Sequence, residues 1–323
     1  MLAAPDGRLV MPSLAEAVAM AERIRESAQV GLNRDHTGLR AELDALNQAR
    51  RRNAQLDRPE LQAALAEAYG ELGSLQKAVR YYQGAIAAKQ GAVSLKAIEQ
   101  YANLKARLAA RRAAKVKAQE ERDEAVAAID EALDALDKLI ALAGPTVERL
   151  NLKGSAYKRL AVVQHAQARK AALAQMRAWY QKAQELATRE GDHAYYSQLM
   201  VITAEILAQH ADGIPGDAER RKRLRRIAGS QRKGPDSTDF WAGVAVGDAL
   251  LLAAIDNGEI SAKEEAEIVQ AYLEPWRRGG SRLKLSSVTE QLEFLSTMLA
   301  EGPPSTDLPR QELIAGLERI RAR

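Results

Sequence analysis

The sequence predicts an all-α protein built from antiparallel helix hairpins. Ala, Leu, Glu, Arg, Lys and Gln dominate its 323 residues, whereas Phe occurs only twice, and these six residues lose the least free energy on entering a helix. Apolar residues recur at helical spacing in segments of about 14 to 20 residues, and no alternating run competes as a strand. We therefore expect about a dozen helices in antiparallel succession.

Capping signals and turn residues divide the chain into these helices. Three S-x-x-E capping boxes predict helix starts at Ser13–Glu16, Ser261–Glu264 and Ser287–Glu290, because serine and glutamate satisfy the free backbone N–H groups of a first turn. Turn-forming residues predict the breaks between helices. The breaks lie at residues 73–74, 91, 144–145, 212–217, 229–237 and 301–307.

One segment, residues 59–90, has the spacing of a tetratricopeptide repeat (TPR). Leu65, Ala66 and Tyr69 stand where the first helix of such a repeat has a large, a small and an aromatic residue, and Gly73 ends that helix. Small residues let two helices approach while aromatic rings fill the space between turns. The second helix has the small, aromatic, small pattern, at Ala78, Tyr82 and Ala85.

A second repeat begins in residues 149–161, where Gly154 aligns with Ala66 and Tyr157 with Tyr69. We interpret Gly154 as a packing residue of a helix, because a phosphate-binding loop would need a second glycine and a preceding strand. Together the repeats predict an α-solenoid of TPR-like antiparallel helix hairpins. Further matches are Tyr180 and Ala183 in its second helix and, more weakly, Ala102 in residues 94–109.

One long helix is expected near residues 93–142. Its second half has a seam of apolar residues that step by three and four, and its charges change from basic to acidic along its length. We favour a solvated charged face with a seam that packs on the neighbouring repeat; a self-associating coiled coil is the alternative. The seam residues are Val126, Ile129, Leu133, Leu136 and Ile140.

Motif content argues against an enzyme. The chain has no cysteine, and its four histidines lack metal-ligand spacing, so neither a thiolate site nor a zinc motif is expected. No P-loop and no G-x-S-x-G pattern occurs, and residues 256–265 lack the first oxygen ligands of a calcium loop. We expect no catalytic residues, no metal and no cofactor, and we interpret 256–265 as a connection between two helices.

Composition also bears on the compartment. The N-terminal residues lack the basic and apolar regions of a secretory signal, and no segment reaches about 18 uninterrupted apolar residues. The absence of cysteine gives no reason to expect an oxidising compartment. We therefore expect a cytoplasmic protein with no membrane partner.

A polar helix face in residues 148–160 is the first candidate binding site. Asn151, Ser155 and Lys158 are spaced i, i+4 and i+7, on the face that lines the concave groove of a TPR array. An amide, a hydroxyl and an ammonium can hydrogen-bond an anionic or polar ligand, and Arg159 follows directly. A solvated helix face is the alternative.

Two adjacent tyrosines, Tyr195 and Tyr196, open the next expected helix. Their rings could stack on a ligand in the groove, so both belong to the candidate site. Packing between repeats is the alternative and more common role for such tyrosines.

A basic run at residues 220–226 is the second candidate site. Six basic residues occupy these positions, in a short helix expected to begin after Asp217 and to end at Gly229. Clustered arginines favour phosphate recognition, although a solvated face or linker helix is the more ordinary interpretation. The run lacks interleaved aromatic residues, and with a net charge of only +4 we do not expect nucleic acid as the partner. The anion-binding candidates are Arg221, Arg225 and Arg226.

Five segments in succession resemble a known family. They are "ERLNLKGSAYKRLA", "AWYQKAQEL", "DHAYYSQLMVITAEIL", "DFWAGVAVGDALLLAAIDNGEI" and "RLKLSSVTEQLEFL". In this order they resemble the TPR-sensor domain (TPR-S), which is similar to the TRAFs-binding central region of apoptosis signal-regulating kinases. The resemblance covers roughly residues 145–300. It divides the chain into an N-terminal helical, TPR-like region with the long charged helix (1–144), the TPR-S-like region (145–300) and a C-terminal capping helix (301–323).

The resemblance implies a regulatory module without catalysis of its own. It also implies sensing of a nucleotide-derived ligand of the ADP-ribose class, within bacterial immunity (antiviral defence) or stress signalling, as in related bacterial domains. They are usually coupled to an effector, so a separate effector protein or a fused effector domain is the expected partner. A plain TPR adaptor for a protein partner, with no small-molecule ligand, is the alternative function, and nucleic-acid binding through residues 220–233 is a third.

Overall fold

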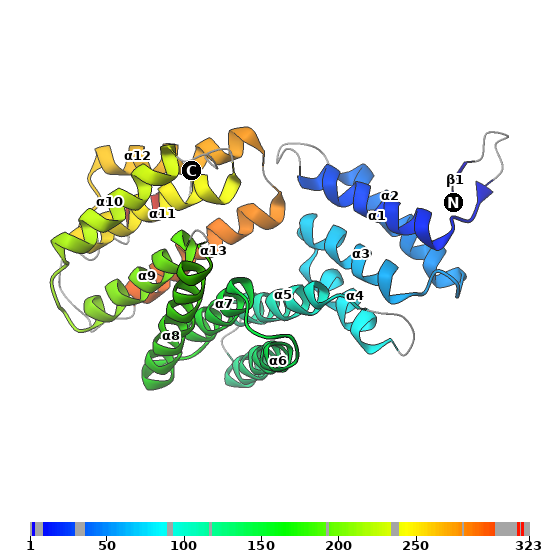
Figure 1. Ribbon diagram of the computed structural model, residues 1–323, viewed down its shortest axis with the longest axis horizontal. Coiled ribbons are helices and arrows are strands. Elements are labelled where there is room, and N and C mark those ends of the chain that lie inside the picture. The colour runs from blue at the N-terminus through cyan, green and yellow to red at the C-terminus, as the bar shows by residue number, and fades with distance from the viewer. Residues whose placement is uncertain are drawn as a thin grey trace.

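The computed structural model is an all-α protein, with thirteen helices among the residues that it describes (Figure 1). The fold class predicted from the sequence is therefore confirmed. The described residues are 2–3, 9–29, 36–88, 93–115, 118–191, 194–233, 239–279, 281–300, 315–316 and 318–319. A small antiparallel pairing of β1 (Leu2–Ala3) with β2 (Leu9–Val10), which the sequence did not predict, precedes the first helix.

Four helices form the N-terminal arm: α1 (Leu14–Gln29), α2 (Thr37–Arg52), α3 (Pro59–Glu71) and α4 (Leu75–Ala87). The predicted capping box starts α1, where the Ser13 amide donates to Glu16 Oε2 at 2.8 Å. The predicted first repeat is the α3–α4 hairpin, with Tyr69 and Tyr82 each only 1% exposed. Gly73 turns the chain between them at a φ of +77°, which glycine adopts without steric cost.

The single long helix predicted near residues 93–142 is wrong. The chain reverses after α5 (Leu95–Ala113), and α6 (Gln119–Ala143) packs back against it. An unbroken helix would expose two apolar stripes to water, whereas the hairpin buries the alanines of α5 against Ile129, Leu133 and Leu136 of the α6 seam. The change of charge has the same origin, because the reversal pairs Lys105 of the basic half with Glu131 of the acidic half.

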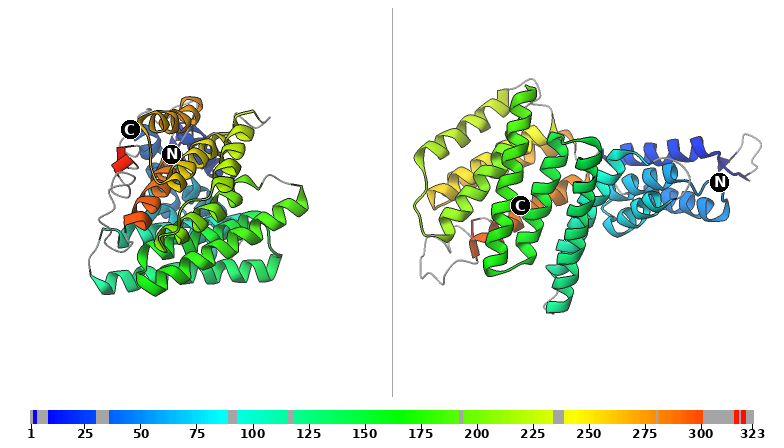
Figure 2. Two further views of the ribbon diagram at one scale, coloured as in Figure 1. Left: turned by 90° about the vertical axis from the view of Figure 1, so that its left-hand side faces the viewer. Right: turned by 60° about the horizontal axis from the view of Figure 1, so that its bottom comes forward.

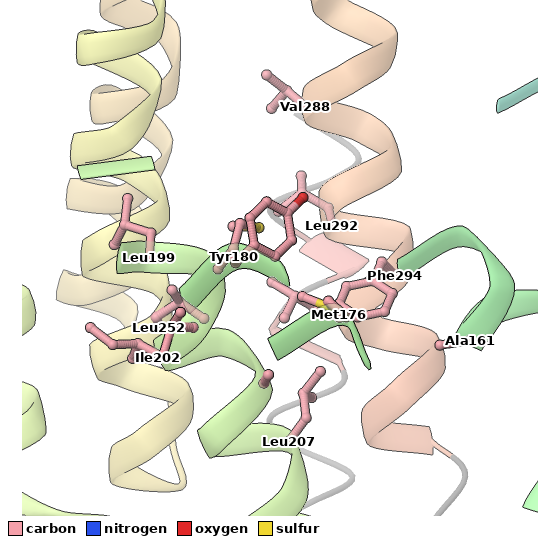
Figure 3. Packing of buried hydrophobic residues seen from close by; sticks show 14 of the residues in the cluster. Ala161, Met176, Tyr180, Leu199, Ile202, Leu207, Leu252, Val288, Leu292 and Phe294 are labelled. Atoms are coloured by element: carbon pink, nitrogen blue, oxygen red, sulfur yellow. The ribbon is translucent and has the colours of Figure 1, made fainter. Parts of the chain in front are cut away.

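The second predicted repeat is the hairpin of α7 (Val147–Val163) and α8 (Ala166–Glu190). Gly154 packs directly against the ring of Tyr180, which is fully buried. Gly154 is therefore a packing residue, as the sequence predicts. Figure 3 shows Tyr180 and Met176 of α8 in one hydrophobic core with Phe294, a residue near the end of the described chain.

Four further helices continue the array: α9 (Tyr195–Ala211), α10 (Ala218–Lys233), α11 (Phe240–Asn257) and α12 (Ala262–Arg278). Asp217 starts α10 by accepting from the Glu219 amide at 2.8 Å, and the predicted capping box at Ser261 starts α12. Residues 256–265 are the expected connection between two helices. The predicted end of α10 at Gly229 is wrong, because a glycine inside a helix costs only about 1 kcal/mol and the helix packs on α11.

The most apolar helix is α11, at the centre of this part of the protein. By length and composition it meets the requirements of a membrane-spanning helix, but 78% of it is buried inside the protein. A core helix of a helical protein has the same features, so this is weak evidence for a membrane span.

The last described helix, α13 (Arg282–Ala300), runs through the middle of the molecule, between α1–α4 and α9–α12 (Figure 1). It contacts α3, α7 and α9. The capping box predicted at Ser287 is wrong: Ser281 accepts from the Lys284 amide at 3.2 Å and starts the helix earlier. Most of the capping helix expected at 301–323 lies outside the described residues. Figure 2 shows from two further sides how far α6 projects from the array.

Candidate functional site

A cavity of about 1190 Å³ opens between the helices at the centre of the protein. We call it the central cavity; its walls come from α5, α7, α9, α11 and α13. Every residue of the first candidate site lines it, although these residues come from two helices that are separated by the whole of α8. They are Asn151, Ser155, Lys158, Arg159, Tyr195 and Tyr196.

Lys158 is held at the junction of α7 and α13. Its ammonium donates a hydrogen bond to Gln291 Oε1 and lies 5.1 Å from the centre of the Phe294 ring. Burial, and then the charge of Arg159, lower the pKa of Lys158 to about 8. Both causes disfavour the protonated form of Lys158. An anion in the cavity would stabilise that charged form.

Three hydrogen-bond donors in the wall of the central cavity have no partner among the described residues. They are Arg159 Nη1, the Gln291 amide nitrogen and the Ser296 hydroxyl. Gln291 is 6% exposed and Ser296 8%, and a buried polar group without a partner costs about 1–3 kcal/mol. Donors left open in the wall of a cavity are the groups that a polar ligand would satisfy.

Two arginines of α5 complete the cationic part of the cavity, and sequence reasoning missed both. Arg107 is 3% exposed, and it donates to Glu290 Oε1 of α13 at 2.7 Å. Arg111 donates to the same oxygen at 2.7 Å. Burial lowers the pKa of Arg107 to about 10; the charge of Glu290 opposes this shift and that of the neighbouring Arg159 adds to it. Their i, i+4 spacing was visible in the sequence, but the error of a single long helix hid the face to which they belong.

Aromatic rings line another part of the same cavity. The Tyr196 hydroxyl lies 3.3 Å from that of Tyr180, and its side chain is still 40% exposed. Trp241 of α11 is 41% exposed and also lines the cavity. The side-chain oxygen of Asn151 already accepts a hydrogen bond, from the Ser197 hydroxyl at 2.8 Å.

Several further carboxyl groups line the central cavity, among them Asp248 and Glu148. Asp248 of α11 accepts from the Tyr272 hydroxyl at 2.6 Å, and burial raises its pKa to about 6. Burial also raises the pKa of Glu148, with a smaller contribution from Glu99. The cavity is therefore of mixed charge, and its excess of cations is local to Arg107, Arg111, Lys158 and Arg159.

The basic run forms one helix, α10, but its three anion-binding candidates do not act alike. Arg221 lies 3.7 Å from Asp256 of α11, beside the buried ion pair of Arg220 with the same carboxylate. Arg225 and Arg226 are exposed. Within the described part of the chain, these two are the cations of 220–226 without a carboxylate partner. Arg226 borders a small cavity of about 260 Å³ that also has acidic walls.

The described residues contain no group of three or more side chains that could hold a metal ion.

Comparison with protein families gives one match. Residues 74–205 match the family Tetratricopeptide Repeats-Sensor, a range that overlaps the sequence-based resemblance over 145–205 and extends it toward the N-terminus. No curated protein matches the chain. The matched range runs from the start of α4 into α9 and includes all six cavity-lining candidates on α7 and α9 as well as Arg107 and Arg111. Residues 74–205 of this chain thus form a Tetratricopeptide Repeats-Sensor (TPR-S) domain.

Proposed function

We propose that this protein is a non-catalytic sensor that binds a small nucleotide-derived anion in the central cavity and passes the signal to an effector. The effector is a separate protein or a fused domain, and the setting is a cytoplasmic immunity or stress-signalling system of bacteria. The TPR-S domain supports the sensor role, and the cavity supports the ligand class.

The cationic cluster is the observation that carries the proposal. Arg107, Arg111, Lys158 and Arg159 gather around one carboxylate, Glu290, in a partly enclosed space. Guanidinium groups bind phosphate oxygens through paired hydrogen bonds, and Arg159 Nη1 is free of any partner among the described residues. A ligand with two phosphate charges would restore the local balance of charge.

The aromatic side chains in the cavity wall indicate that the ligand also carries a flat ring. Tyr196 and Trp241 keep substantial exposed area on the cavity side of α9 and α11, and base–aromatic stacking contributes about 1–3 kcal/mol. A ligand that joins a diphosphate to a flat ring would use both walls. ADP-ribose has this composition, and we use it as the probe.

The experiment measures the binding of ADP-ribose, inorganic pyrophosphate and adenosine by calorimetry and by thermal shift. ADP-ribose is expected to bind more tightly than either fragment, because it alone reaches both walls. Lys158→Ala and Arg159→Ala should each weaken binding by about tenfold or more, the ordinary loss for a charged hydrogen bond. Arg225→Ala, on the exposed face of α10, is the control and should bind as the wild type does. No binding of any probe would refute the proposal.

A plain adaptor function is the second candidate, and the size of the cavity favours it. Pockets for small molecules are about 300–1,000 Å³, and this one is about 1190 Å³. A protein segment seated in the cavity would leave nucleotide probes without effect. Stoichiometric capture of a single protein that Lys158→Ala releases, together with flat titrations of all three probes, would establish the adaptor.

A further inference from the structure

Glu290 occupies the centre of the cationic cluster. Its Oε1 accepts hydrogen bonds from Arg107 and Arg111, both at 2.7 Å. The surrounding cations, Arg107 first and then Arg159, hold the pKa of Glu290 below its ordinary value although burial opposes this. Glu290 is therefore a fixed negative charge in the place where the cluster would otherwise receive an anionic ligand.

The carboxylate satisfies the cluster only in part. Glu290 and Asp248, whose charge acts on Lys158, together face four cations. Arg159 Nη1 has no partner among the described residues. Lys158 turns to the neutral oxygen of Gln291, the next residue of α13, so its charge is not paired with a carboxylate there. A dianionic ligand would offer the cluster more than Glu290 does.

The hydrogen bonds of Glu290 also fix the position of α13. This helix lies between α1–α4 and α9–α12 and contacts α3, α7 and α9. Arg107 also donates to the Ser286 hydroxyl at 2.8 Å. Arg107 and Arg111 are thus the link between α5 and α13 across 183 and 179 residues of chain. Any anion that takes these arginines from Glu290 removes that link.

We propose that Glu290 is an internal competitor for the anion site, and that a ligand which displaces its carboxylate from Arg107 and Arg111 loosens α13 within the groove. The inference rests on the proposed function and adds its regulation. The displaced carboxylate swings toward the open side of the cavity, where water takes up its charge. Loosening of α13 is the change that an effector would read.

Displacement of Glu290 links the affinity for the ligand to the position of α13. Ligand affinity is reduced by the cost of displacing Glu290, and the position of α13 shifts only as far as the ligand prefers the displaced state. Because coupling is reciprocal, a variant that releases α13 in advance binds the ligand more tightly. Tighter binding on loss of Glu290 distinguishes a competitor from a residue that only supports the fold, because loss of a supporting residue would weaken binding.

Glu290→Gln in the full chain tests the inference. The variant should bind ADP-ribose about tenfold more tightly than the wild type, which corresponds to about 1.4 kcal/mol. Hydrogen exchange along 282–300 should be faster in the unliganded variant than in the unliganded wild type. ADP-ribose should speed exchange there in the wild type and have little further effect in the variant.

Glu131→Gln is the matched control. Glu131 pairs with Lys105 of α5 outside the central cavity, so its loss removes a more exposed ion pair of the same helix and should leave affinity and α13 exchange unchanged. Glu290→Asp, which keeps the charge but shortens the side chain, serves if the glutamine variant does not fold. It should also bind more tightly and speed exchange, by smaller factors.

Two outcomes distinguish failure of the competitor role from failure of the proposed function. If the wild type binds ADP-ribose and neither Glu290 variant binds it more tightly, the competitor role is overturned while the proposed function stands. If neither the wild type nor the variants bind any of the three probes, the proposed function fails and the competitor role fails with it.

Discussion

Gly154 and Tyr180 are in contact so close that no larger residue fits at position 154: a Cβ atom there would lie 2.7 Å from Cδ2 of the tyrosine ring. The ring is fully buried, so it has no free space into which to move. The closest approach of α7 and α8 depends on this absence of a side chain.

The first prediction is that Gly154→Ala destabilises the protein. Overpacking costs about 1–3 kcal/mol, and the better helix propensity of alanine offsets up to about 1 kcal/mol, so a net loss of about 1–2 kcal/mol is expected in urea denaturation. Gly229→Ala is the control, because a Cβ there meets nothing within 4 Å; it should stabilise slightly. Equal stability of Gly154→Ala and the wild type would contradict the packing role.

The second prediction concerns the pH dependence of ligand binding. The pKa of Lys158 is lowered to about 8, so its charge is lost as the pH rises from about 7 to about 9.5. ADP-ribose keeps a constant charge over this range, and its affinity should therefore fall with rising pH. Lys158→Arg keeps its charge throughout and should give a nearly flat profile. A wild-type profile as flat as that of the arginine variant would exclude Lys158 from the site.

The third prediction concerns stability and Asp248. Burial raises the pKa of Asp248 from its ordinary value of 3.8 to about 6, so between these values the folded protein holds a proton that the unfolded chain has lost. Stability therefore falls as the pH rises through about 4 to 6. Asp248→Asn still accepts from Tyr272 and should be more stable at pH 7.5, by up to about 3 kcal/mol. A lower melting temperature than the wild type at that pH would argue that the Asp248 charge is needed.

The fourth prediction concerns the buried ion pair between α10 and α11. Asp256 is 5% exposed and Arg220 7%, and Asp256 Oδ2 also accepts from the Asp217 amide at 3.1 Å. Asp256→Ala should cost about 3–5 kcal/mol, because it leaves a buried arginine unpaired. Arg232→Ala, which breaks the exposed pair with Glu267, should cost less than about 1 kcal/mol. Similar losses in the two variants, measured by chemical denaturation, would contradict the ranking.

Local signals in the sequence were sufficient for most of the helices. The capping boxes at Ser13 and Ser261, the turn at Gly73 and the small-residue contact at Gly154 each depend on a few neighbouring residues. The α5–α6 reversal could not be found in this way, because residues 114–118 contain neither glycine nor proline. Its only sequence signal was the change from basic to acidic charge, which indicates a partner of opposite sign rather than a longer helix.

The candidate site was predictable on α7 and at the start of α9, and no further. The i, i+4, i+7 spacing placed Asn151, Ser155 and Lys158 together, and helical geometry guarantees that result. Arg107 and Glu290 meet only because α13 returns to the middle of the array. No periodicity reports a contact between residues 183 positions apart, so this half of the site needed the structure.

That return of α13 also fixes the order in which the protein is completed during synthesis. Domains fold largely from the N-terminus as the chain emerges, so α5 and α7 are made long before Glu290 exists. Until then Arg107 and Arg111 belong to an open half-groove without their counter-charge. The cation cluster is thus finished only after α13 (residues 282–300) has left the ribosome.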